Sequence, residues 1–508
     1  MRILLSIICL CGCSLLFPAY MRGQGINYVV DITQPHQKAF HVTMEIPASP
    51  GLLRVSMPMS APGSTTSFNA AKYVVHVTAQ DPSRASLKVE RLDKQAWGIS
   101  VPTSEVVSIH YVVLLNSTDK LRLQSNWIDE QTGGFFNGAS LFLYSPSLLQ
   151  LPVSLALKLP KNWQTVTSLN RTGDGTFAAA NYRQLLDHPV QFGVLEERGI
   201  EAANTHWRLI FDSPLPAYDK GAFDENLRKI IAAEIRIMGD TPYRQFTVFF
   251  HWRPDLEYGG GMEFGQDIIM NIGKDWMEDL PDDVSGTFAH ELFHAWNAIA
   301  MYPRGFDRWD YGRENYTNLM WFQEGVTSYY AVLAMVRGGV RPNRFFDMLS
   351  NAVTTFEGQN GRGFISLADA SVADWIDPIE SIDFYSSGEV VGFLLDCQIR
   401  RATHGEHSLD DAMRLLYKRS RQPGYAGYDE AELVRAVNTV AGRDFGPFLR
   451  ALVDTNRAID YNAVLQGLGA SVTIAQEQDQ KTFTLQLSKE LSAEQQAFWQ
   501  AIQSASAK

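Results

Sequence analysis

A short apolar segment that contains two histidines and a glutamate constrains this chain most. Residues 287–297 read Thr-Phe-Ala-His-Glu-Leu-Phe-His-Ala-Trp-Asn, so His290 and His294 are four residues apart. On a helix this spacing places both imidazoles on one face, and the neighbouring Phe, Leu and Trp residues predict a buried helix. Because buried histidines need polar partners, the fold must bring further polar groups to this face.

The same segment is typical of a zinc hydrolase. Two histidines at this spacing can bind one metal ion. Glu291 follows the first histidine directly and can reach a water on the ion without binding the metal. The alternative is a pair of histidines that form ordinary hydrogen bonds, which the apolar surroundings make costly. One Zn²⁺ per chain is therefore the predicted cofactor.

Two glutamates compete for the place of the third metal ligand. Glu314 follows His294 after 19 intervening residues and Glu324 after 29, and spacing alone does not choose between them. Glu324 lies in the apolar helical run 319–325, where an unpaired carboxylate is costly unless it binds a cation. Glu314 lies in the polar stretch 311–315, where an acid needs no special reason. The surroundings favour Glu324.

The rest of the chain predicts about three domains, because it has 508 residues, of which 45% are hydrophobic. This composition excludes disorder and a disulfide-rich scaffold. Strand-like runs and turn signals come first, mixed elements follow, and helices dominate later. The predicted parts are a β domain at 26–197, a catalytic domain at 198–340, a helical domain at 341–470 and a short extension at 471–508.

Particular elements can be predicted from periodicity and capping signals. Strands are expected at 42–46, 53–57, 73–77, 106–115, 151–159 and 246–252. Helices are expected from 281 onward and at 318–336, 343–356, 389–401, 409–419, 430–441 and 492–502. The net charge is −12, and no basic run or basic helical face is present, so nucleic acid is not an expected partner.

The N-terminus resembles a secretory leader, predicted to cover residues 1–25. One positive charge precedes a short apolar run, which is too short to span a bilayer. Leu-Cys-Gly-Cys at 10–13 resembles a lipobox, which would leave Cys13 as a lipid anchor; the alternative is cleavage near 23–25. No transmembrane helix is expected in the mature chain. The predicted location is outside the cytoplasm of a bacterium, as a periplasmic, secreted or membrane-anchored lipoprotein form.

Cysteine usage agrees with this interpretation. Three of the four cysteines lie in the first 13 residues, and only Cys397 lies in the body of the chain. Since Cys397 falls inside a predicted helix, we expect a core thiol and no disulfide framework.

Three motifs around the candidate ligands form a recognisable set. They are His-Glu-Leu-Phe-His-Ala-Trp-Asn at 290–297, Arg-Glu-Asn-Tyr-Thr at 313–317 and Trp-Phe-Gln-Glu-Gly-Val-Thr-Ser-Tyr-Tyr at 321–330. This set resembles the glycyl aminopeptidase family of metallopeptidases, a relative of the gluzincin aminopeptidases. The resemblance implies a multidomain α+β fold with an N-terminal β-sandwich-like domain, a thermolysin-like zinc catalytic domain and a C-terminal α-helical lobe. It also implies the ligands His290, His294 and Glu324, with Glu291 as the general base.

A further motif concerns substrate binding. Gly-Gly-Met-Glu at 260–263 is similar to the exopeptidase motif of gluzincin aminopeptidases, whose glutamate holds the α-amino group of the substrate. The resemblance implies that Gly260, Gly261 and Met262 line the substrate and that Glu263 binds its N-terminus. Such an ion pair selects which peptide end enters the site. Without the resemblance, a solvated turn acid is the simpler interpretation.

The last motif concerns the oxyanion. Phe-Tyr-Ser-Ser-Gly at 384–388 resembles the Tyr-x-Lys-Gly segment of these enzymes, whose tyrosine donates to the developing oxyanion. Tyr385 stands at the matching position and is the second candidate catalytic residue, although Ser387 replaces the usual lysine. The alternative is a tyrosine that anchors a loop to the core.

The resemblance covers roughly residues 26–470 and has two departures. Many family members carry a C-terminal PDZ domain, but 38 residues follow Ala470 here, fewer than the roughly 50 that a domain needs, so none is expected. The basic residues usual after Trp-Asn are replaced by Ala-Ile-Ala-Met-Tyr-Pro at 298–303. This second departure leaves substrate preference open.

The sequence therefore predicts a zinc-dependent aminopeptidase that acts on short peptides, its partner being the peptide substrate. A preference for N-terminal Gly or Ala is implied by the resemblance alone. One alternative is a zinc endopeptidase of the same fold, in which Glu263 has no role in recognition. The other is a non-catalytic, envelope-bound peptide-binding protein, against which the complete set of base and ligands argues. The oligomeric state is left open.

Overall fold

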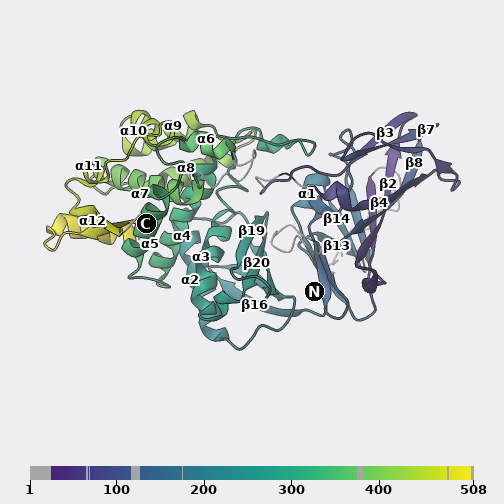
Figure 1. The fold of residues 1–508 in the computed structure, drawn as a ribbon, viewed down its shortest axis with the longest axis horizontal. Coiled ribbons are helices and arrows are strands. Elements are labelled where there is room, and N and C mark those ends of the chain that lie inside the picture. Colours follow the sequence, from purple (N-terminus) through teal and green to yellow (C-terminus); the bar gives the residue numbers. More distant parts are fainter. Residues whose placement is uncertain are drawn as a thin grey trace, which may run out of the picture.

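The computed structural model describes residues 25–63, 67, 69–115, 126–173, 175–373, 382–477 and 480–504. The predicted leader, with Cys13, lies outside the described residues. The molecule is elongated, with strands at one end, helices at the other and the sheet of β19 and β20 between them (Figure 1). No helix in the described part of the chain is long and apolar enough to cross a membrane.

The N-terminal β region, β1 to β15, is built on one large sheet. In the described residues the strand order of this sheet is β13-β14-β11-β1-β2-β8-β4-β5. In β2, buried apolar residues at positions 40, 42, 44 and 46 alternate with more exposed ones, as a half-buried strand requires. The strands are β1 (Ile26–Asp31), β2 (Ala39–Ala48), β4 (Val74–Gln80), β5 (Ser86–Leu87), β8 (Glu105–Leu114), β11 (Val153–Lys158), β13 (Asn170–Gly173) and β14 (Thr176–Ala179).

Two smaller sheets, ordered β3-β7-β6 and β12-β15-β10-β9, pack against the large one. Met44, Ile99 and Phe192, one from each sheet, belong to a single buried cluster, which confirms a sandwich-like domain. The elements are β3 (Gly51–Ser56), β6 (Val89–Arg91), β7 (Ala96–Val101), β9 (Trp127–Asp129), β10 (Gly133–Phe136), β12 (Gln164–Val166) and β15 (Val190–Gly193), with short helices η2 (Pro35–Gln37), η3 (Ala70–Tyr73), η4 (Gly138–Ser140) and α1 (Tyr182–Leu186).

A mixed sheet, ordered β16-β17-β18-β20-β19, forms the middle of the molecule. Successive residues of its strands face opposite sides: Phe250 packs in the helical core, whereas Phe249 packs toward the N-terminal β region. The elements are β16 (Glu196–Ala202), β17 (Thr205–Phe211), α2 (Lys220–Met238), β18 (Gln245–Arg253), β19 (Gly260–Phe264), β20 (Asp267–Gly273), η5 (Asp275–Met277) and α3 (Leu280–Phe293). The helix α2 was not predicted from the sequence.

Helices make up the next part of the chain, as predicted. Helix α7 begins at Phe384 and not at 389, because the Asp383 side chain caps its first turn. Cys397 on α7 is buried and free. The elements are η6 (Phe306–Arg308), η7 (Trp321–Val326), α4 (Thr327–Gly338), α5 (Phe345–Glu357), α6 (Leu367–Ala373), α7 (Phe384–Ala402), α8 (Leu409–Ser420), α9 (Glu430–Ala441), α10 (Gly446–Val453) and α11 (Tyr461–Leu465).

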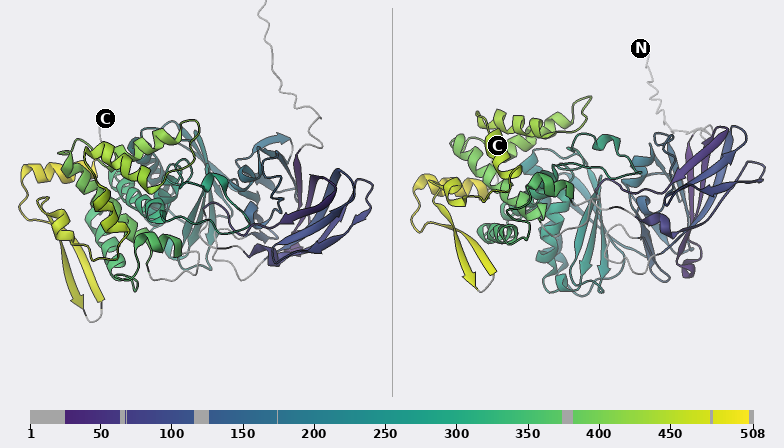
Figure 2. Two further views of the ribbon diagram at one scale, coloured as in Figure 1. Left: turned by 90° about the horizontal axis from the view of Figure 1, so that it is seen from above. Right: turned by 45° about the horizontal axis from the view of Figure 1, so that its top comes forward.

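The C-terminal extension contains a hairpin that was not predicted. Strands β21 (Ala470–Glu477) and β22 (Gln480–Leu487) project at the helical end of the molecule (Figure 2). On α5, the hydroxyl groups of Ser350 and Thr354 accept hydrogen bonds from the backbone of β22. Helix α12 (Ala493–Gln503) follows, with the expected capping box of Ser492 and Gln495.

Two buried ion pairs lie in the helical part of the molecule, one between α4 and α8 and one within α7. Arg337 of α4 pairs with Asp410 of α8 at 2.8 Å, and Arg400 of α7 pairs with Asp396 at 3.1 Å. Both guanidinium groups also donate to backbone carbonyl oxygens of α12. Trp499 and Ile502 of α12 are also buried in the hydrophobic cluster of the helical part, so α12 forms part of the core.

We expect Asp410→Ala to destabilise the protein by about 3–5 kcal/mol, because it leaves the buried Arg337 cation without its partner. The matched control is Asp347→Ala, which breaks an exposed pair with Arg344 and should cost less than about 1 kcal/mol. Urea unfolding followed by circular dichroism measures both. Equal effects of the two substitutions would contradict this description of the core.

Candidate metal centre and active site

Helix α3, which carries both histidines, begins with residues that favour a helix start. Pro281 lies in its first turn, and Asp282 and Asp283 place negative charge at the N-terminal end of the helix dipole. The helix ends at Phe293 with His294 as its C-cap, but φ of −61° and ψ of −20° keep His294 helical. The two imidazoles therefore leave the same face.

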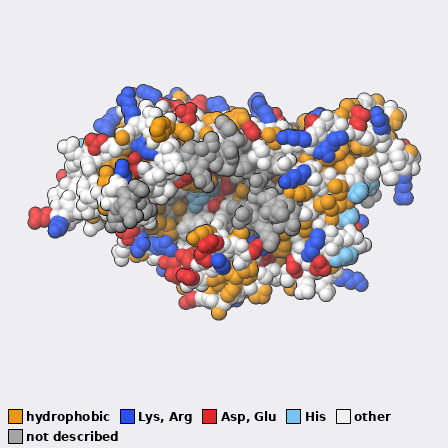
Figure 3. All heavy atoms as spheres, viewed as in Figure 1, with side chains coloured by type: hydrophobic (Ala, Val, Ile, Leu, Met, Phe, Trp, Pro, Cys, Tyr) orange, Lys and Arg blue, Asp and Glu red, His pale blue; other side chains and the backbone are white. Residues whose placement is uncertain are grey.

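Three polar side chains converge at this face. The Nε2 atoms of His290 and His294 lie 3.0 Å apart, and Oε2 of Glu324 lies 3.3 Å from the first and 3.2 Å from the second. His294 and Glu324 are buried, and the side chain of His290 is 14% exposed. Figure 3 shows histidine and acidic side chains gathered in a hollow in the middle of one face of the molecule.

The second ring nitrogen of each histidine is held by a polar neighbour. Nδ1 of His294 lies 2.9 Å from the carbonyl oxygen of Asn297, which can only accept, so Nδ1 carries the proton. Nδ1 of His290 lies 3.2 Å from the Ser328 hydroxyl, and that hydroxyl donates to the carbonyl of Glu324. Both Nε2 lone pairs then point toward each other and toward a carboxylate, an arrangement that favours a cation among them.

Glu324 lies on an irregular helical turn. The segment η7 is a π-helix that runs directly into α4, and short π segments are frequent at functional sites. The amide of Asn297 donates to the carbonyl oxygens of Phe322 at 2.9 Å and Gln323 at 3.2 Å. Asn297 thereby ties the end of α3 to the turn that carries Glu324.

Two glycines allow α7 to approach this turn closely. A Cβ on Gly388 would lie 2.0 Å from the carbonyl oxygen of Trp321, and one on Gly325 would lie 2.3 Å from the Cα of Gly388. No other residue fits at either position. The contact places Tyr385, near the start of α7, beside the metal centre: its ring centroid is 5.7 Å from that of His290.

Two further carboxylates, those of Glu263 and Glu291, lie near His294. One oxygen of Glu263, one oxygen of Glu291 and a ring nitrogen of His294 lie within 4.8 Å of one another, and all three side chains are buried. Glu263 belongs to β19, the edge strand of the mixed sheet. On the same strand, a Cβ at Gly261 would lie 2.3 Å from Cγ of Glu291. The strand that carries residues 260–263 therefore runs directly against the candidate base.

Burial and neighbouring charges shift the pKa values of these groups. Burial would lower the pKa of His294, but Glu324, Glu263 and Glu291 raise it well above its usual range. Burial raises the pKa of Glu291 strongly and that of Glu263 to about 7. Burial would also raise the pKa of Glu324, but His294 and His290 hold it well below its usual range. Three carboxylates around two histidines form an environment that favours a bound cation.

The N-terminal β region also reaches the site. Gly63 has φ of +80°, and a Cβ there would lie 3.2 Å from Oε1 of Glu263. Ser60 holds this loop, because its hydroxyl donates to the carbonyl of Arg313 at 2.6 Å and accepts from Nε1 of Trp309 at 3.0 Å. The backbone around Gly63 therefore forms one side of the space around Glu263.

Glu314 lies apart from the histidines. Its carboxylate accepts hydrogen bonds from the hydroxyl of Ser67 at 3.1 Å and from that of Tyr316. Among the described residues, the groups that could hold a metal include Glu324 and not Glu314. The geometry thus favours the same choice as the apolar surroundings of Glu324.

The donor set fits a catalytic transition metal. Two imidazoles and one carboxylate are a common catalytic zinc set, which leaves a coordination position open for water or substrate. Calcium and magnesium prefer oxygen ligands only. The buried donors, their fixed tautomers and the surplus of carboxylates all agree with a divalent ion at His290, His294 and Glu324.

Comparisons with known proteins agree with the fold. A model of the Peptidase M61 N-terminal domain matches residues 27–194, and the M61 glycyl aminopeptidase model matches residues 283–391. An aminopeptidase N family protein from Idiomarina loihiensis has a TM-score of 0.81 and 22% identity, over 88% of this chain and 79% of that one. An M1 zinc metallopeptidase from Deinococcus radiodurans, a glutamate-to-alanine mutant bound to a Tyr-Ser-Ala substrate, has a TM-score of 0.53 and 15% identity, over 86% of this chain and 95% of that one. No curated protein gives a significant match.

The fold and the buried set of histidines and carboxylates define a metallopeptidase. The two family models cover the N-terminal β region and the segment from α3 into α7, which contains the candidate ligands. The chain belongs to the M61 glycyl aminopeptidase family, as its motifs indicated.

Several residues that support the site were given no role from the sequence. The family motifs contain four of these residues, Asn297, Ser328, Gly325 and Gly388. Their place within the motifs is the sequence signal that could have pointed to a role. Gly63 lies in a different domain and far away in the sequence. Its contact with Glu263 depends on how the N-terminal β region packs, for which the sequence gives no local signal.

We expect Glu324→Ala to lose most of its bound zinc, whereas Glu314→Ala should retain about one ion per chain. The reason is that Glu324 approaches both histidines and Glu314 does not. Elemental analysis after dialysis of the purified variants measures the metal content. If Glu314→Ala alone empties the site, the assignment of the third ligand is wrong.

We expect Ser328→Ala to weaken zinc binding by about tenfold or more, because His290 loses the group that fixes its tautomer. Ser328→Thr keeps the hydroxyl and should bind as the natural protein does. Ser420→Ala is the control, since that hydroxyl only donates to the carbonyl of Tyr417. Competition with a fluorescent zinc chelator measures the affinity; no change in Ser328→Ala would contradict this role.

Proposed function

We propose that this metallopeptidase is a zinc-dependent aminopeptidase that removes N-terminal residues, preferentially Gly or Ala, from short peptides. Family membership supports peptide hydrolysis, and Glu263 supports the aminopeptidase mode. In this proposal His290, His294 and Glu324 hold one zinc ion per chain. The preference for small residues rests on the family alone.

One observation carries the aminopeptidase mode: the buried carboxylate of Glu263 beside that of Glu291. Zinc-dependent hydrolysis needs the ligands and one general base, and Glu263 serves neither purpose. A buried carboxylate needs a counter-charge, which the α-ammonium group of a peptide supplies. Because Glu263 lies on edge strand β19, an extended peptide can lie along the strand while its N-terminus meets this carboxylate.

The residues then divide the reaction among them. When bound, zinc supplies Lewis acidity, which acidifies a water molecule and polarises the scissile carbonyl. Glu291 accepts the proton of the attacking water at a carboxylate oxygen and later delivers it to the leaving amine nitrogen. The Tyr385 hydroxyl donates a hydrogen bond to the carbonyl oxygen as negative charge develops there. Glu263, with Gly260 to Met262, holds the N-terminus and so fixes the scissile bond relative to Glu291.

We also propose that the chain is exported in a bacterium. The apolar run after Arg2 supports a leader, and the lipobox-like sequence supports a lipid anchor at Cys13. Cleavage near residues 23–25 would instead give a free periplasmic or secreted form. Mass spectrometry of the mature N-terminus distinguishes the two forms, and an intact chain kept in the cytoplasm would contradict export.

Two isosteric substitutions separate the roles of the buried glutamates. Glu291→Gln should lower kcat by about 10²–10⁴-fold through loss of the general base, with zinc content unchanged. Glu263→Gln should raise KM for peptides with a free N-terminus by about tenfold or more, through loss of a charge-assisted hydrogen bond. Steady-state hydrolysis of alanine p-nitroanilide measures both parameters.

The exposed Glu278 provides the control, since Glu278→Gln makes the same chemical change outside the site. If Glu291→Gln is as active as the unsubstituted protein, the assignment of Glu291 as general base is wrong. An unchanged KM in Glu263→Gln would instead favour the endopeptidase alternative.

A further inference from the structure

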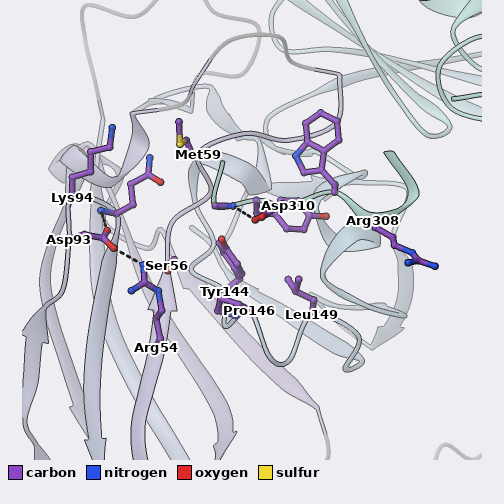
Figure 4. A pocket seen from close by; sticks show the side chains of 14 residues that line it. Arg54, Ser56, Met59, Asp93, Lys94, Tyr144, Pro146, Leu149, Arg308 and Asp310 are labelled. Carbon is purple, nitrogen blue, oxygen red and sulfur yellow. Dashed lines mark hydrogen bonds and ion pairs between the residues drawn. The ribbon is translucent and has the colours of Figure 1, made fainter. Parts of the chain in front are cut away.

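A second cavity lies where the N-terminal β region meets the loop that follows α3 (Figure 4). Its volume is about 520 Å³, within the roughly 300–1,000 Å³ of small-molecule sites. Residues of β3 and of the turn before β7 form one wall, and residues 308–312 form the other. The residues of the metal centre are not among those that line it.

The base of this cavity is apolar. Tyr144 and Trp309 line the cavity and are almost fully buried. Met59, Pro146 and Leu149 complete the surface. Such a base provides a packing surface for an aliphatic or aromatic group of a ligand.

Charged groups of both signs surround the Tyr144 hydroxyl. Burial raises the pKa of Tyr144, Asp310 and Asp93 raise it further, and Arg54 lowers it, so all three charged side chains lie within electrostatic range of this hydroxyl. In Figure 4, Arg54 and Asp93 lie on one side of the cavity and Asp310 on the other. Lys94 lines the same side as Arg54 and forms no ion pair within the part of the chain that the structure describes.

The charged groups of the cavity, Arg54, Asp93 and Asp310, are partly exposed. Arg54 contacts Asp93 through one nitrogen only, at 2.6 Å, and the two side chains are 47% and 45% exposed. Asp310 pairs with Arg313 at 3.1 Å, and its side chain is 53% exposed. Arg54 therefore keeps donor positions open to a ligand. Both oxygens of Asp310 already have one partner each, the backbone N–H of Gly312 at 2.9 Å and Arg313, so a ligand would use their remaining lone pairs.

We propose that this cavity binds a zwitterionic α-amino acid with an apolar side chain. Its carboxylate would meet Arg54 and Lys94, its ammonium group would meet Asp310, and its side chain would pack on the apolar base. Arg54 and Lys94 lie beside Asp93 on one wall and Asp310 lies on the other, so a ligand that carries both charges finds a partner for each charge. This proposal concerns binding and does not depend on the chemistry at the metal centre.

The test is calorimetric titration of L-leucine into the zinc-loaded full chain. Arg54→Ala should weaken binding in the cavity by about tenfold or more, because it removes a charge-assisted hydrogen bond. Arg308→Ala is the matched control: it removes the same charge from the rim, but its side chain is 90% exposed and points away from the cavity (Figure 4).

Further titrations distinguish binding in this cavity from binding in the active site and test whether the ligand needs both charges. Glu263→Gln, which changes the active site, should leave leucine binding in the cavity intact. N-acetyl-leucine and leucinamide each lack one charge and should bind about tenfold more weakly or worse. The proposal is wrong if leucine does not bind, if Glu263→Gln abolishes all binding, if Arg54→Ala behaves like Arg308→Ala, or if either singly charged analogue binds as well as leucine.

Discussion

The approach of two imidazole nitrogens and one carboxylate oxygen in a buried space is the interaction on which the rest of this structure depends. The Nε2 atoms of His290 and His294 lie 3.0 Å apart, and both lie beside the carboxylate of Glu324. The fold holds them there by hydrogen-bonding their opposite ring nitrogens to Asn297 and Ser328. Asn297 serves twice, because its carbonyl orients His294 while its amide holds the turn that carries Glu324.

The surrounding domains bring further groups to the candidate metal centre. Edge strand β19 brings Glu263 against Glu291, and the N-terminal β region brings the backbone at Gly63 against Glu263. Helix α7 reaches the same place from the other end of the chain through the contact of Gly325 with Gly388. Three separate parts of the chain thus meet at one site. This arrangement gives the N-terminal β region a part in shaping the space around Glu263.

Local patterns allowed much of the site to be predicted. The spacing of His290 and His294 and the apolar surroundings of Glu324 are local, and they indicated the candidate ligands that the structure brings together. Contacts between distant segments had no such signal: Gly63 meets Glu263 only through domain packing. Helix α2 and the hairpin of β21 and β22 were missed as well. Residues of the hairpin are largely exposed and polar, so the alternation that marks a strand is weak.

We propose that the buried carboxylate of Glu263 turns a zinc hydrolase into an enzyme that recognises a free N-terminus. The most direct measurement compares tri-alanine with N-acetyl-tri-alanine as substrates of the zinc-loaded protein, with products identified by mass spectrometry. We expect stepwise release of alanine from the free peptide and at least about 100-fold lower kcat/KM for the blocked one, since the ammonium partner of Glu263 is missing. Equal cleavage of both peptides would contradict this proposal.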